Sequence, residues 1–276
     1  MGQTPRNHPV AIRRRNAAGR RRLTNAGLST GTTTRNAEGM WAECMWIVGI
    51  ETSGLEGSAA LLRKDEVIAE RRLATAGRRH AQTLLAEIRD LLLAAGLSPR
   101  SVDAVAVSLG PGSFTGLRVG VVCAKTWAYA TRCQVIGLET FLICAAAAPA
   151  DWSRVWVVAD AQRGDFFAAE YQRRDELRWQ RITPLTIVSS ADWLRQRQPG
   201  ERIAGPGVTK IAEGSTAAFV AREEWSLRPS AAVLARQARQ LLAEGRADDF
   251  WTLVPIYLRP SAAEEKRAPA APDTTA

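Results

Sequence analysis

The chain has 276 residues, enough for one large domain or two modest ones, and its 46% hydrophobic and 24% charged residues are ordinary for a globular protein. No apolar run reaches the roughly 18 residues that a membrane span needs, and four cysteines without CxxC spacing favour a reducing cytoplasm. With only His8 and His80, a zinc site built on paired histidines is close to excluded, and we expect no metal site.

The net charge of +9 resides mostly in the first part of the chain. Residues 1–44 carry eight arginines against two glutamates and show no apolar periodicity, so we expect a disordered basic extension. Met45 stands directly before the first predicted strand. This favours the interpretation that the translation start has been assigned too far upstream over the alternative that residues 1–44 are a basic arm that touches RNA. The Ala- and Pro-rich residues 261–276 predict a second disordered tail.

The pattern of residues 45–150 predicts a first α/β domain with a mixed sheet. "WIVGIETS" and "GSAALLRKDEVIAERRL" predict three short strands. The elements expected next are a helix over 80–95, a strand over 102–108, a helix over 115–131, a strand over 134–137 and a helix over 138–148.

Residues 151–260 predict a second domain that again begins with strands. "RVWVVADA" and "DFFAAEYQRR" indicate a hairpin around Arg163–Gly164, and "LRWQRITPLTIV" indicates a strand broken by Pro184. A short helix, the strand "ERIAG", a helix over 230–244 and the last ordered segment "VPIYLRP" follow. Two halves that each open with three strands suggest a duplicated unit, although no sequence repeat supports it.

The stretch "SLGPGSFTGLRVG", residues 108–120, leads from a predicted strand into a predicted helix. Such a loop either holds an anion on backbone N–H groups at the helix start or only turns the chain, with Ser113 or Thr115 capping the helix. It lacks the Gly-Lys-Ser/Thr ending of a P-loop. The candidate nucleotide or anion loop comprises Thr52, Ser53, Gly110, Gly112, Ser113 and Thr115.

Four segments in order, "IVGIETSGLEGSAALL", "GPGSFTGLRVGVVCAKTWAYA", "DAQRGDFFAAEY" and "PIYLRPS", resemble the TsaB (YeaZ) family over about residues 45–261. The resemblance implies an actin/sugar-kinase/Hsp70-like (ASKHA) fold of two related domains, each a mixed sheet flanked by helices. It also implies a cytoplasmic dimerisation subunit of the machinery that attaches threonylcarbamoyl to N6 of adenosine 37 in tRNAs reading codons that begin with A. The implied partners are a TsaD-type catalytic subunit, a TsaE-type ATPase, tRNA through the complex, and a second copy when the chain is alone.

The resemblance also bears on catalysis. Active kinases of the superfamily place an aspartate where this chain has Glu51, and Arg163 puts a bulky side chain in the second loop, residues 160–164. The catalytic paralogue carries two histidines one helical turn apart, whereas the equivalent helix here offers only His80. We therefore expect a non-catalytic scaffold that binds no cofactor alone, with ATP or ADP at the joint surface of the complex. The alternatives are a small-molecule kinase or ATPase of the same fold and a glycoprotease-like hydrolase.

The resemblance implies that the helices over 80–95 and 115–131 meet the catalytic subunit. The first helix has one apolar stripe and leaves Leu93 facing outward, whereas the second is apolar nearly all round. Small residues at i+4 steps form a ridge over which another helix could pass closely. The predicted interface is Leu93, Gly116, Gly120, Ala124 and Ala128. Ala124→Arg should then break partner binding and leave the monomer folded, unless the ridge seats the helix on its own sheet.

Overall fold

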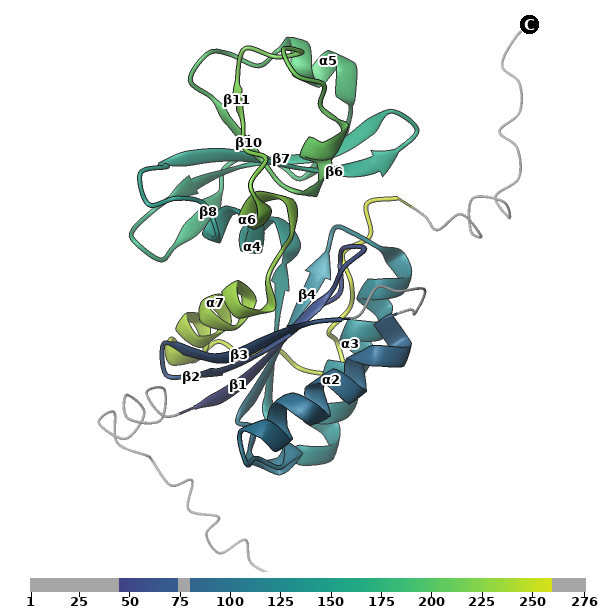
Figure 1. Cartoon of the computed structure of the whole chain (residues 1–276), viewed down its shortest axis with the longest axis vertical. Coiled ribbons are helices and arrows are strands. Elements are labelled where there is room, and N and C mark those ends of the chain that lie inside the picture. Colours follow the sequence, from purple (N-terminus) through teal and green to yellow (C-terminus); the bar gives the residue numbers. More distant parts are fainter. Residues whose placement is uncertain (1–44, 74–79, 260–276) are drawn as a thin grey trace, which may run out of the picture. The chain divides into compact units, whose positions relative to one another are not determined.

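A computed structural model describes residues 45–73 and 80–259, without the side chains of residues 80–82. The predictions for residues 1–44 and 261–276, and for the side chain of His80, lie outside the described residues. Two mixed β-sheets with flanking helices make up the described chain (Figure 1). Within the described ranges, none of the helices is both long and apolar enough to cross a membrane.

The first sheet has five strands in the spatial order β3-β2-β1-β4-β5. Its strands are β1 (Trp46–Glu51), β2 (Ser58–Arg63), β3 (Glu66–Arg72), β4 (Ala104–Gly110) and β5 (Gln134–Glu139). The central strand β1 pairs antiparallel with β2 and parallel with β4. Because helices cover both faces of the sheet, β1 is buried on both sides and its sequence is a continuous apolar run rather than an alternating one.

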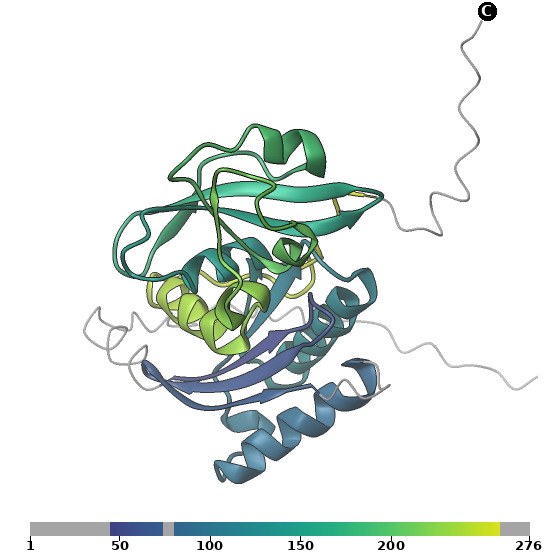
Figure 2. The ribbon, with the colours of Figure 1, turned by 45° about the horizontal axis from the view of Figure 1, so that its top comes forward.

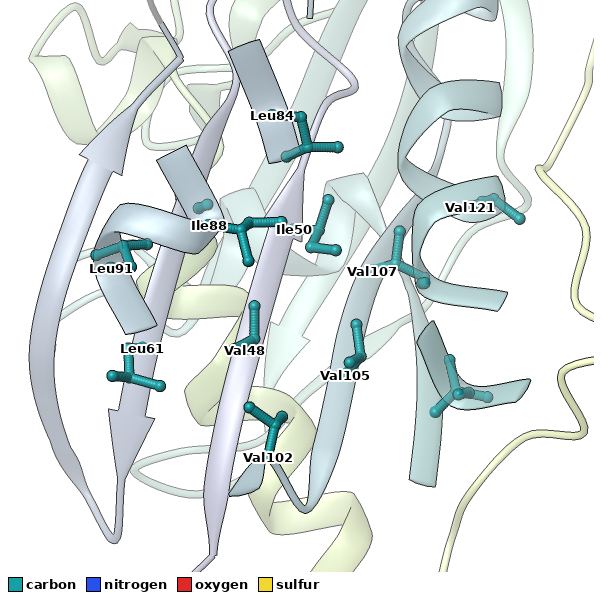
Figure 3. Packing of buried hydrophobic residues seen from close by; sticks show 14 of the residues in the cluster. Val48, Ile50, Leu61, Leu84, Ile88, Leu91, Val102, Val105, Val107 and Val121 are labelled. Atoms are coloured by element: carbon teal, nitrogen blue, oxygen red, sulfur yellow. The ribbon is translucent and has the colours of Figure 1, made fainter. Parts of the chain in front are cut away.

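Helices α2 (His80–Ala94) and α3 (Phe114–Thr131) cover one face of this sheet (Figure 1). Leu84, Ile88 and Leu91 of α2 point toward Val48, Ile50 and Leu61 of the strands (Figure 3). Helix α7 (Ala231–Ala243) lies on the opposite face of the sheet (Figure 2). Its Leu234, Ala235 and Ala238 pack against the strands there. The first sheet is therefore the middle layer of three.

The second sheet repeats the pattern of the first. Its spatial order is β11-β10-β6-β7-β8, with β9 also paired to β7. Its strands are β6 (Arg154–Gln162), β7 (Asp165–Arg173), β8 (Trp179–Arg181), β9 (Thr186–Ser189), β10 (Arg202–Ala204) and β11 (Phe219–Val220). In each sheet the first strand along the chain pairs antiparallel with the second and, on its other side, parallel with a later strand: β1 with β4, and β6 with β10. The remaining elements are α4 (Thr140–Ala146), α5 (Ser190–Arg195), α6 (Glu224–Leu227), and 3₁₀ turns at Pro99–Ser101 and Pro206–Lys210.

The last part of the chain returns to the first sheet, which corrects the expected division into sequential domains 45–150 and 151–260. Helix α7 packs on β1 and β2, as described above. Residues 248–257 then run along the edge strand β5 and along α3: Asp248 N–H donates to the Val135 carbonyl at 2.8 Å, and Ile256 N–H donates to the Leu109 carbonyl at 2.7 Å. The structural unit around the first sheet thus needs residues from both ends of the described chain.

Candidate partner-docking surface

The turn after β1 and the loop before α3, which together form the predicted nucleotide or anion loop, lie in direct contact. The backbone N–H of Ser113 donates to the carbonyl of Ser53 at 2.6 Å. Gly112 packs so closely that an added Cβ would lie 2.4 Å from the same carbonyl oxygen. Thr52 and Ser53 are buried, whereas Gly112, Ser113 and Thr115 are exposed. The structure therefore brings these residues together, with only the α3 side open to solvent.

The buried carboxyl group of Glu51 faces inward at this turn. Its Oε1 accepts the backbone N–H of Ser53 at 2.6 Å, and among the described residues its Oε2 has no hydrogen-bond partner. Burial raises the pKa of Glu51, and the hydrogen bonds from Ser53 oppose that rise only in part. The Ser53 N–H and the Glu51 Oε1 are thus already used in a hydrogen bond to each other.

Ser113 begins helix α3. Its Oγ accepts the backbone N–H of Gly116 at 3.2 Å, so of the two hydroxyl residues considered from the sequence, Ser113 is the N-cap. The Gly110–Gly112 segment makes the turn, and Gly110 adopts φ +107°, a conformation that favours glycine. The loop therefore fixes where α3 starts and how closely it approaches β1.

The second loop, residues 160–164, is a tight hairpin turn between β6 and β7. Gln162, Arg163 and Gly164 have φ of 64°, 58° and 82°, and the Oδ1 of Asp160 accepts the Gln162 N–H at 2.7 Å. Arg259 donates to the Ala161 carbonyl at 2.6 Å. The hairpin predicted around Arg163–Gly164 is confirmed, and the C-terminal segment holds it.

The structure corrects the interface prediction for Gly116, Gly120, Ala124 and Ala128. All four are buried, and Ala124 is 0% exposed within the core that α3 shares with its own sheet. At Gly120 an added Cβ would lie 2.3 Å from the Oγ1 of Thr52. Small residues occupy this ridge because α3 sits close to β1 and β4, which was the alternative left open by the sequence.

The opposite side of α3 forms one wall of an exposed apolar groove, and α2 forms the other. The groove has a volume of about 700 Å³. Leu93 is 67% exposed and Val122 61% exposed, so Leu93 remains a candidate interface residue. The lining residues are Leu84, Leu85, Ile88, Arg89, Leu92, Leu93, Leu97, Pro99, Arg118, Val119, Val122, Cys123, Thr126, Trp127, Ala130 and Thr131.

Sequence reasoning missed Leu85 and Val122 as members of this surface. Leu85 is 66% exposed although it lies beside the buried Leu84. The available signal was the same in both helices: each carries more apolar residues than its buried stripe needs. Contiguous exposed apolar surface of this kind marks interaction sites in soluble proteins.

The repeated strand order and the flanking helices define an actin/sugar-kinase/Hsp70-like α/β protein, and its first two long helices enclose an exposed apolar groove. A family model described as "TsaD: tRNA N6-adenosine threonylcarbamoyltransferase" matches residues 74–232. "tRNA threonylcarbamoyladenosine biosynthesis protein TsaB" of Escherichia coli (strain K12) is 31% identical, over 80% of this chain and 98% of that protein. The protein of the same name from Bacillus subtilis (strain 168) is 29% identical, over 80% of this chain and 97% of its own.

A solved structure gives the same assignment. "YeaZ from Pseudomonas aeruginosa" superimposes with a TM-score of 0.65 and 26% sequence identity, covering 78% of this chain and 100% of that chain. The chain belongs to the TsaB (YeaZ) family.

Proposed function

We propose that this chain is the non-catalytic scaffold subunit of the complex that adds threonylcarbamoyl to N6 of adenosine 37 in tRNA. Its TsaB relatives are named for threonylcarbamoyladenosine biosynthesis, which makes the chain a component of that pathway. The matching family model carries the name of the transferase itself, so the partner is a TsaD-type subunit of related sequence. This chain binds and organises that subunit.

The observation that carries the proposal is the groove between α2 and α3. A stable monomer gains nothing from leaving Leu85, Leu93 and Val122 in water, since burying one such side chain is worth about 1.5–3 kcal/mol. Two helices that present one continuous apolar face fit a pair of helices on another subunit. We assign this face to the TsaD-type subunit.

The positions of the acidic side chains support a non-catalytic role. The carboxyl group of Glu51 is buried and accepts the Ser53 N–H. The Oδ1 of Asp160 accepts the Gln162 N–H within its own hairpin turn. Arg259 binds the Asp165 carboxylate at 2.8 Å, so this acid serves to hold the C-terminal segment. Burial raises the pKa of the Cys144 thiol far above its ordinary value, which leaves it a poor nucleophile.

The remaining parts of the proposal concern the assembled complex. Gly112, Ser113 and Thr115 are the exposed part of the loop, and a nucleotide at the joint surface would meet this chain there. A TsaE-type ATPase and tRNA join through the complex, and self-association of the free chain would use the same groove. The alternative of an independent kinase predicts ATP turnover by the purified chain, which our proposal does not.

The direct test is binding between the purified full-length chain and its purified TsaD-type subunit, measured by calorimetry. Leu93→Lys and Val122→Lys place a charge on the groove and should abolish binding while the thermal midpoint of the free chain stays unchanged. Leu177→Lys is the matched control, because Leu177 is 53% exposed and lies in the loop between β7 and β8, away from the groove. Full binding by both groove variants would refute the proposed docking face.

A further inference from the structure

Arg118 occupies a fixed position at the groove. Its guanidinium lies 3.9 Å over the ring of Phe114, and its Nε donates to the Tyr257 hydroxyl at 3.1 Å. The Tyr257 ring itself packs on Phe114 at a centroid distance of 4.6 Å. An arginine held by an aromatic ring and one hydrogen bond has lost much of its rotamer freedom before any partner arrives.

No carboxylate in the described residues lies within ion-pair distance of Arg118. The other arginine of the groove, Arg89, differs in this respect, because its Nε and Nη2 each lie 2.9 Å from the Oδ1 of Asp90. The Nε of Arg118 donates to Tyr257. In the described contacts, its two terminal nitrogens remain able to donate hydrogen bonds. A guanidinium so presented binds a carboxylate or a phosphate by paired hydrogen bonds, and on a protein helix the group of this kind is a carboxylate.

The lining of the groove contains two arginines and no aspartate or glutamate. In a two-fold symmetric dimer the same surface patch faces itself. A second copy of this chain would therefore match the apolar part of the groove but would bring no acidic lining residue to Arg118. A different chain, with an acid beside its apolar stripe, satisfies both parts of the surface.

We propose that Arg118 selects the catalytic subunit over a second copy of this chain, by pairing with a carboxylate beside the apolar stripe of the incoming helix. The inference rests on the proposed function, because it assumes that the TsaD-type subunit occupies the groove. Phe114 and Tyr257 are positioning residues for the guanidinium. The apolar side chains of the groove attract the TsaD-type subunit and a second copy of this chain alike. Arg118 supplies the difference in affinity between the two.

The test compares Arg118→Gln with Arg89→Gln in the full-length chain. Affinity for the purified TsaD-type subunit is measured at low and high salt, and self-association is measured by sedimentation. Arg118→Gln should weaken heterodimer formation at least about 30-fold and flatten its salt dependence, because it leaves the partner's carboxylate unpaired in the interface. It should not weaken self-association. Arg89→Gln should change the heterodimer affinity less than about threefold, as expected for an exposed arginine with an acid of its own.

Two further variants separate a charge-pairing role from a structural one. Arg118→Lys keeps the charge but not the planar fork, and should give a loss intermediate between wild type and Arg118→Gln. Tyr257→Phe keeps the aromatic ring and should also lower the heterodimer affinity, by releasing the guanidinium. Equal effects of Arg118→Gln and Arg89→Gln, or an equal loss of heterodimer and self-association in Arg118→Gln, would overturn the inference.

The Leu93→Lys variant distinguishes the failure of this inference from the failure of the proposed function. If Leu93→Lys abolishes heterodimer formation and Arg118→Gln does not affect it, the docking face stands and the role of Arg118 is wrong. If neither variant affects it, both the docking face and the role of Arg118 are wrong.

Discussion

Gly49 of β1 lies directly against Ala231, the first residue of α7. A Cβ added at Gly49 would stand 2.3 Å from the carbonyl oxygen of Ala231 and 3.3 Å from the Cβ of Ala235. The N–H of Ala231 donates to the Ser58 hydroxyl of β2 at 2.9 Å, so the same contact is fixed from two strands. The absent side chain of Gly49 therefore sets how closely α7 approaches the first sheet.

Gly49→Ala should lower the free energy of unfolding by about 1–3 kcal/mol, because the backbone of α7 must move to admit the methyl group. Denaturant unfolding of the full chain measures the change. Gly54→Ala is the control, because the nearest atom to an added Cβ there is 3.5 Å away, which is ordinary contact. Equal stability of the two variants would show that α7 does not pack on β1 as described.

Ser113→Ala should lower the free energy of unfolding by about 1 kcal/mol, because it removes the acceptor for the Gly116 N–H at the start of α3. Thr115→Ala changes an exposed hydroxyl at the second residue of the helix and should alter stability by less than about 0.5 kcal/mol. The two variants are compared by thermal and denaturant unfolding. A larger effect at Thr115 would contradict the assignment of the N-cap.

Glu51→Gln should change how stability depends on pH. Because burial raises the pKa of Glu51, the folded chain holds this proton more tightly than the unfolded chain does. The contribution of Glu51 to stability is thus fully present below the unfolded value of 4.5 and is lost as pH rises through the folded pKa. Glutamine keeps the acceptor for the Ser53 N–H and does not titrate, so the variant should gain stability relative to wild type as pH rises through this range.

Denaturant unfolding at a series of pH values measures this difference. If the free energy of unfolding of Glu51→Gln minus that of wild type falls or stays constant as pH rises, the carboxyl group is not buried in the fold.

Ala124→Arg should unfold the free chain rather than break a complex. Ala124 is fully buried between α3 and its sheet, and an arginine there would place an unpaired charge in the core, at a cost of several kcal/mol. Val122→Arg, two residues earlier on the exposed side of the same helix, should leave the fold intact. Circular dichroism and thermal unfolding of the purified variants decide between the two. A folded Ala124→Arg protein would instead support the first prediction, in which the small residues of α3 form the partner surface.

The sequence allowed the strands of the first sheet and helices α2, α3 and α7 to be predicted, because each is an apolar or periodic segment of sufficient length bounded by turn residues. It could not show the two-residue strand β11 or the four-residue helix α6, which are shorter than any periodic signal. Pattern alone also could not assign α7 to the first sheet. That assignment depends on the absence of a side chain at Gly49, far away in sequence.

The candidate site was predictable only in part. The small residues at Gly120 and Ala124 indicate close packing but not the partner of that packing, and the structure shows that the partner is the chain's own sheet. The groove face depends on which apolar residues remain after each helix has covered the sheet. Val122 and Leu93 could be identified as exposed only once both helices were placed on the strands.

The most direct test of the central claim is the threonylcarbamoyladenosine content of tRNA in cells whose own copy of this protein has been depleted. We predict that wild type and Leu177→Lys restore the modified nucleoside. Leu93→Lys and Val122→Lys, expressed as folded proteins at equal levels, should not restore it, because neither can hold the TsaD-type subunit in the groove between α2 and α3. Full restoration by both groove variants would contradict the assignment of this face to the catalytic subunit.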